Sequence, residues 1–137
     1  MRKGSRNPLA VAAVAFVAAN VLHTLDHVRQ GLGGLTFEIV LGGTTLSVLA
    51  IVVMLMALRH HPRAPAFCAV VGISGAVGVA ASHLAPHWSA LSDPYPDLHV
   101  DALSWIVMLG EIGAALALAI VALRELRRQA GAQPAHA

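Results

Sequence analysis

Four long stretches of this 137-residue chain carry almost no charged side chains. They cover residues 8–27, 37–58, 65–87 and 100–123. A helix needs about 20 apolar residues to cross a bilayer, and each stretch reaches that length. Only 12% of the residues are charged, whereas soluble domains carry about 25%. The sequence therefore predicts an all-α membrane protein with four transmembrane helices in the lipid bilayer.

The segments between these stretches are short and rich in turn-forming residues. Glycines lie in the first link, prolines 62 and 65 bound the second, and prolines 94 and 96 lie in the third. Short links make neighbouring helices antiparallel, so we predict an up-down-up-down bundle. The expected organisation is a basic N-terminus at residues 1–7, a transmembrane domain at 8–124 and a polar tail at 125–137.

The basic side chains predict how this bundle is oriented. Cytoplasmic loops of membrane proteins carry an excess of Lys and Arg. Only Arg29 falls on the side that would be outside. We therefore expect a multi-pass protein of the cytoplasmic (inner) membrane with both termini in the cytoplasm. The residues on the predicted inner side are Arg2, Lys3, Arg6, Arg59, Arg63, Arg124, Arg127 and Arg128.

The first stretch has a second interpretation as a cleaved signal peptide. Arg2 and Lys3 precede an apolar run, and Ala18, Ala19 and Asn20 resemble a cleavage region. The apolar pattern continues beyond this point, which favours a retained span.

Composition excludes some classes of protein. The net charge of +2 does not indicate a nucleic-acid partner, because the basic residues flank apolar stretches and form no groove with aromatics. Cys68 is the only cysteine, so a disulfide within the chain is impossible. We expect Cys68 to be a small core residue. A homo-oligomer or a larger membrane complex is compatible with the small size.

Five of the eight histidines fall where predicted spans end on the outer side. Residues four apart share one face of a helix. The side chains of His23 and His27 therefore point in the same direction, and so do those of His83 and His87. Imidazole and carboxylate are typical ligands of Zn, Fe and Cu. The sequence therefore predicts a metal site at the extracytoplasmic ends of the helices. Its candidate ligands are His23, His27, His83, His87, His99, Asp26 and Asp101.

Two glutamates extend this pattern. Glu38 opens the second span and is a candidate ligand or general base, or else a solvated residue favoured by the helix dipole. Glu111 shares a helical stripe with Asp101 and would lie roughly 15 Å deeper. We expect Glu111 to be a separate buried or proton-handling acid. Its expected partners are the hydroxyls of Thr44, Thr45, Ser47 and Ser74.

Other polar and small residues receive structural roles. Asp93 and Asp97 are expected to be solvated loop residues. Trp88, Tyr95 and Trp105 are expected to form an aromatic belt at the membrane interface. Small residues are predicted to give the third span a face for close packing, namely Gly72, Gly75, Ala76, Gly78 and Ala80.

Several functions are compatible with this pattern. The first is a membrane metalloenzyme that acts on a lipid or amphipathic substrate, although four spans leave little room for a substrate. The alternatives are transport or sensing of metal ions or protons, and a haem-binding or structural subunit of a complex. The histidines could also be interfacial residues bound to water and headgroups. In ligand chemistry alone, the HxxxH pairs resemble the histidine motifs of membrane desaturases, hydroxylases and seven-span zinc amidases, whose spacings differ.

Overall fold

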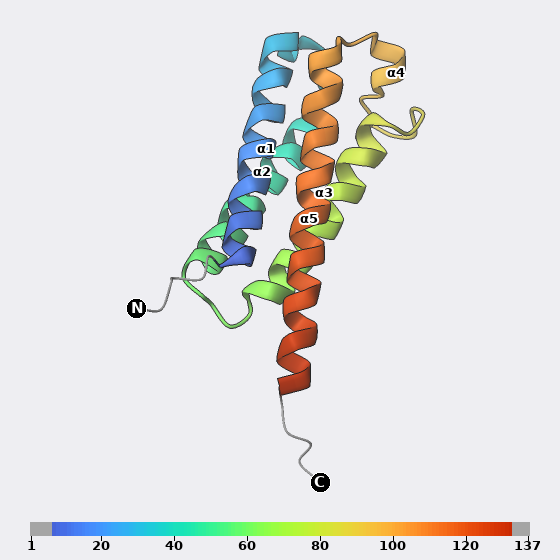
Figure 1. The fold of residues 1–137 in the computed structure, drawn as a ribbon. Coiled ribbons are helices and arrows are strands. Elements are labelled where there is room, and N and C mark those ends of the chain that lie inside the picture. Colours follow the sequence, from blue (N-terminus) through green and yellow to red (C-terminus); the bar gives the residue numbers. More distant parts are fainter. Residues whose placement is uncertain (1–6, 133–137) are drawn as a thin grey trace.

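The computed structural model describes residues 7–132, and its regular structure over that range is entirely helical (Figure 1). The predicted basic residues Arg2, Lys3 and Arg6 lie outside the described residues, as do the last five residues of the predicted tail. The four long helices are each long and apolar enough to cross a membrane, which confirms the all-α prediction. They are α1 (Pro8–Gln30), α2 (Phe37–Leu58), α3 (Ala64–His83) and α5 (Ala102–Ala132), with the short helices η1 (Leu32–Gly34) and α4 (Tyr95–Leu98) between them.

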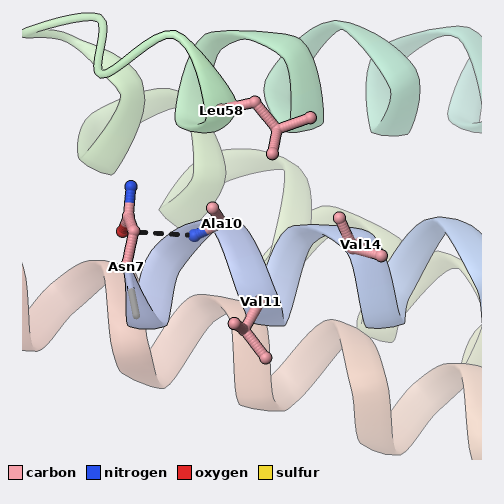
Figure 2. Close-up of a pocket in the computed structure, with 5 residues that line it drawn as sticks. All are labelled: Asn7, Ala10, Val11, Val14 and Leu58. Atoms are coloured by element: carbon pink, nitrogen blue, oxygen red, sulfur yellow. Dashed lines mark hydrogen bonds between the residues drawn. The ribbon is translucent and has the colours of Figure 1, made fainter. Parts of the chain in front are cut away.

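The start of α1 is fixed by Asn7. Its Oδ1 accepts hydrogen bonds from the backbone N–H groups of Leu9 and Ala10, at 3.1 and 3.3 Å, which satisfies free donors at the helix N-terminus. Its Nδ2 donates to the Ala57 carbonyl at 3.1 Å, so the start of α1 lies beside the end of α2. Figure 2 shows this corner, where Leu58 faces α1 across a hollow that is also lined by Asn7, Ala10, Val11 and Val14.

Helix ends differ from the predicted spans at two places that matter for the site. Helix α1 continues past His27 to Gln30 and stops at Gly31, whose φ of +95° suits glycine. Helix α3 ends at His83 rather than at residue 87. Pro86 explains this difference, since the residue before a proline avoids the helical conformation.

At the other end of the chain, α5 continues through the basic residues of the predicted tail to Ala132. The predicted boundary at residue 124 therefore does not mark the end of the helix. Charged side chains are compatible with a helix that extends beyond the bilayer.

Helices α3 and α5 approach each other most closely at Gly72. A Cβ atom there would lie 2.7 Å from the Ala115 carbonyl oxygen and 2.9 Å from the Ala119 nitrogen. Cys68 is also buried in this core, as expected. Gly78 was predicted to belong to this packing face, but it does not. It is exposed, and a Cβ atom there would meet nothing within 4 Å.

We predict that Gly72→Ala lowers the free energy of unfolding by about 1–3 kcal/mol, because the added methyl group must push two backbones apart. Gly78→Ala is the matched control on the same helix and should raise stability by up to about 1 kcal/mol, because alanine favours the helix and the added methyl group meets no neighbour. Unfolding of the detergent-purified variants, followed by circular dichroism, measures the difference. Equal stability of the two variants would contradict the close α3–α5 packing.

Helix α2 has fully buried side chains only in its second half. Its buried side chains are Ala50, Val53 and Ala57, and none is buried between residues 37 and 49. Opposite α1, this first half carries small residues, including Gly42 and Gly43. A cavity of about 730 Å³ lies here between α1, α2 and α3. The structure therefore differs from the sequence-based expectation that the bundle leaves little room.

Candidate metal centre

Three of the predicted ligand residues meet at one point. The rings of His23 and His27 from α1 stack with centroids 4.7 Å apart. The His83 ring from α3 lies 5.0 Å from His23 and 5.3 Å from His27. One potential ligand atom from each histidine lies within 4.8 Å of the other two. We call these three residues the histidine cluster.

Helical spacing brings the cluster together. On α1, the buried stripe runs Ala13, Phe16, Asn20 and His23, with steps of three and four residues. On α3, the buried residues Gly72, Gly75, Val79 and His83 repeat with the same steps. The inward stripe of α3 therefore ends in histidine, and that of α1 carries His23 and then Asp26. His27 lies one turn after His23 and is partly exposed.

Hydrogen bonding orients the His83 ring. Its Nδ1 lies 3.0 Å from the carbonyl oxygen of Asp93. A carbonyl only accepts, so Nδ1 donates and Nε2 keeps its lone pair. The backbone of Asp93 is itself held by its N–H, which donates to the Ser82 carbonyl at 2.9 Å. This is the arrangement that commonly orients a metal-binding histidine.

The His23 ring is oriented by a buried carboxylate on α5. Its Nδ1 contacts Glu111 Oε2, while Asn20 Nδ2 donates to Glu111 Oε1 at 2.8 Å. Ser47 from α2 donates to Asn20 Oδ1 at 2.7 Å. All described buried side-chain nitrogen and oxygen atoms have a hydrogen-bond partner. A continuous network of hydrogen bonds therefore joins three helices, through the side chains of Ser47, Asn20, Glu111 and His23.

Tyr95 of α4 covers the cluster at this end of the bundle, where α4 lies in Figure 1. The Tyr95 ring is 1% exposed, and its centroid lies 4.5 Å from that of His83. Its Oη lies 3.3 Å from His23 Nε2. Burial raises the pKa of Tyr95 to about 12, so the phenol keeps its proton at neutral pH and can donate to this nitrogen. The sequence interpretation of Tyr95 as a belt residue missed this role.

Asp93 is a second carboxylate beside the histidine cluster. Its Oδ2 lies 3.6 Å from His83 Nδ1 and 3.9 Å from His27 Nδ1. Burial raises the pKa of Asp93, and the nearby His23 opposes that shift. The structure therefore contradicts the expectation of a solvated residue, because the loop after α3 folds back over the helix end.

The cluster fits a transition-metal ion. Zinc binds histidine nitrogens at about 2.0–2.1 Å, so two nitrogens on one tetrahedral ion lie about 3.4 Å apart. The donor atoms lie within 4.8 Å of one another, so they could hold one ion after moving closer together. Haem fits less well, because it needs a flat gap between two axial histidines and these rings are in mutual contact.

Two predicted ligands, Asp26 and Asp101, lie outside the histidine cluster and form hydrogen bonds with Arg29 instead. Asp26 is buried and accepts from Arg29 Nε at 2.8 Å and from Gln30 Nε2 at 2.7 Å. Asp101 accepts two hydrogen bonds from Arg29, each at 2.9 Å. The Ser104 N–H and then Arg29 lower the pKa of Asp101. This Arg29 group joins the end of α1 to the start of α5.

Three other candidates lie at the protein surface. His87 is exposed because α3 ends before it. His99 is exposed at the end of α4, with a left-handed φ of 51°. Glu38 is exposed in the first turn of α2, where a carboxylate is favoured by the helix dipole. The structure therefore brings none of these three side chains into the histidine cluster.

Glu111 is closer to the cluster than its predicted depth implied. From the sequence, the depth of Glu111 was predicted relative to Asp101, and all the histidines were predicted to lie at helix ends. However, His23 is seven residues before the end of α1, roughly 10 Å into the bundle. Glu111 is nine residues after the start of α5, roughly 13 Å deep. The two side chains therefore meet, and only Ser47 of the expected hydroxyl partners joins them, through Asn20.

Asn20 was also missed by the sequence interpretation, which considered it only as part of a cleavage region. Its position three residues before His23, on the same stripe, is the signal that could have identified it.

The chain matches no family model, no curated protein and no solved structure. Its function is therefore inferred from the chemistry of the histidine cluster and its surroundings.

Proposed function

We propose that this chain is a multi-pass protein of the cytoplasmic membrane that binds one transition-metal ion through His23, His27 and His83. The observation that carries this proposal is the approach of the three imidazoles to within 4.8 Å. It is supported by the hydrogen bonds at Nδ1 of His23 and His83, which leave Nε2 as the ligand atom of each ring. At His23, the metal would displace the hydrogen bond from Tyr95 to Nε2. Zn, Fe and Cu all suit imidazole ligands.

In this proposal the helices alternate in direction and both termini face the cytoplasm. The Asn7–Ala57 hydrogen bond joins the start of α1 to the end of α2, and the Arg29–Asp101 pair joins the end of α1 to the start of α5. Both contacts support antiparallel neighbours. With the positive-inside distribution of Lys and Arg, the histidine cluster then faces the extracytoplasmic side.

We further propose that the ion has a catalytic role. Three protein ligands with an open position are typical of catalytic rather than structural zinc. A bound metal would polarise a carbonyl group or supply a nucleophilic water. The substrate would reach it from the adjacent cavity, which His23, His27 and His83 line together with apolar side chains.

Transport is less well supported than binding. On the far side of Glu111 from the cluster, the buried side chains are apolar apart from Cys68, and they include Phe16, Val53 and Leu118. A path for ions across the bundle would need polar side chains or water along its length.

A metal-binding comparison of His83→Ala with His87→Ala tests the proposal. The two variants remove the two members of one HxxxH pair, but only His83 belongs to the cluster. We expect one zinc ion per wild-type chain and a loss of affinity of about 100-fold or more in His83→Ala, because even an indirect partner of a ligand contributes 10–100-fold. His87→Ala should bind as the wild type does. Competition titration with a chromophoric chelator measures both affinities, and equal losses would contradict the assignment.

A further inference from the structure

We infer that the cavity beside the histidine cluster binds a single-chain, uncharged amphiphile, with its oxygen-bearing head at the histidines and its chain between α2 and α3. The location of the head depends on the proposed metal-binding function. The location of the chain depends on the cavity alone.

The size and position of the cavity support this occupant. Its volume of about 730 Å³ is about five times that of a cavity that holds benzene, roughly 150 Å³. It therefore has room for a head and part of an alkyl chain. Its walls come from the first half of α2 and the second half of α3, two membrane-spanning helices. Exposed Val77 and Gly78 lie along it, so a chain could enter from the lipid.

The ionisable side chains of the cavity lining are grouped at the histidine cluster. They are His23, His27, His83 and Glu111, and the remaining polar lining residues are uncharged. Several wall hydroxyls are already bonded within their own helices: Thr45 donates to Leu41, and Ser74 donates to Val70. These hydroxyls therefore need no polar partner from a ligand, and the rest of the wall suits a hydrocarbon chain.

The charge of the lining favours an uncharged head over a phosphate. Within the described part of the chain, no Lys or Arg lines the cavity. Arg29, the nearest basic residue along α1, is held by Asp26 and Asp101. The only acidic lining residue, Glu111, is bonded to His23 and Asn20. In the metal-free protein, a phospholipid phosphate would thus have no Lys or Arg side chain to pair with, whereas a carbonyl or hydroxyl oxygen could accept a hydrogen bond from an imidazole.

Photolabelling with a long-chain alcohol that carries a diazirine on its chain tests this inference. The full-length protein is labelled in nanodiscs, and the labelled peptides are located by mass spectrometry. We expect saturable labelling of residues 42–49 of α2 and 74–83 of α3. In protein treated with a chelator, unlabelled hexadecanol should compete for this labelling, and hexadecyl phosphate should not.

Two cavity-filling variants and one control make the test specific. Gly43→Leu and Gly78→Leu place a side chain where a Cβ atom meets nothing within 4 Å, and both positions line the cavity. Each should lower the saturable labelling by about tenfold, equivalent to about 1.4 kcal/mol of binding. Gly113→Leu adds the same side chain at an equally open position on α5 that does not line the cavity. It should leave labelling unchanged.

The outcomes separate this inference from the metal proposal. Saturable, variant-sensitive labelling that persists after chelator treatment would support the chain site even if the metal titration failed. Labelling spread evenly over all four helices, or insensitive to both filling variants, would overturn the inference even if zinc binds. Equal competition by hexadecyl phosphate would overturn the uncharged head. Size-exclusion chromatography and circular dichroism identify any variant that fails to fold. If one cavity-filling variant fails, the labelling of the other cavity-filling variant tests the inference.

Discussion

Glu111→Ala should lower the free energy of unfolding by about 3–5 kcal/mol, the usual effect of removing one partner from a buried pair. Glu111 is 1% exposed and is the shared partner of His23 and Asn20, which are 5% and 6% exposed. The substitution leaves both largely buried groups without their shared acceptor. Unfolding of detergent-purified protein, followed by circular dichroism, measures the loss.

Glu111→Gln separates the role of the network in stability from its role in metal binding. The amide oxygen can accept from Asn20, and the NH2 group can donate to His23 Nδ1 once that ring takes its other tautomer, so most of the stability should be retained. It lacks the negative charge that strengthens a histidine ligand, so zinc affinity should fall by about 10–100-fold. If both variants are as stable as the wild type, the buried network does not hold the helices together. Unchanged zinc affinity in Glu111→Gln would show that Glu111 does not tune His23.

Tyr95→Ala should have an effect of similar size on stability. The ring is the largest fully buried side chain of the described residues, and it contacts His83 and Trp105 with centroid distances of 4.5 and 5.7 Å. Removing a buried aromatic ring costs about 3–5 kcal/mol. Since the ring also covers the histidine cluster, its removal should open the cluster to water.

Tyr95→Phe is the control, because it keeps the ring and removes only the hydroxyl next to His23 Nε2. Its loss of stability should be about 0.5–1.5 kcal/mol. Thermal unfolding ranks the three proteins, and hydrogen exchange of α1 amides near His23 reports the access of water. A result in which Tyr95→Ala is as stable as Tyr95→Phe would show that α4 is not part of the packed core.

The sequence predicted the helices well because the relevant signals are local. An apolar run long enough to span a bilayer is recognisable without any tertiary contact, and each of the four observed long helices overlaps one predicted stretch. The stripe of Ser104, Met108 and Glu111 on α5 was also predictable from period alone, and all three residues are buried.

The membership of the histidine cluster was less predictable. His83 and His87 look equivalent by spacing, and only the effect of Pro86 on the helix end separates them. Asp93 and Tyr95 reach the cluster because the loop after α3 folds back over it, which no periodic pattern encodes. Asp26 was predicted as a ligand on spacing, yet its carboxylate is held by Arg29 and Gln30.

The central claim is that His23, His27 and His83 bind one metal ion. X-ray absorption at the zinc edge of the zinc-loaded protein tests it most directly. The account predicts a first shell with three imidazole nitrogens at about 2.0–2.1 Å, and two in His83→Ala loaded at excess zinc. A shell of oxygens without imidazole scattering, or a sulfur at about 2.3 Å from Cys68, would contradict it.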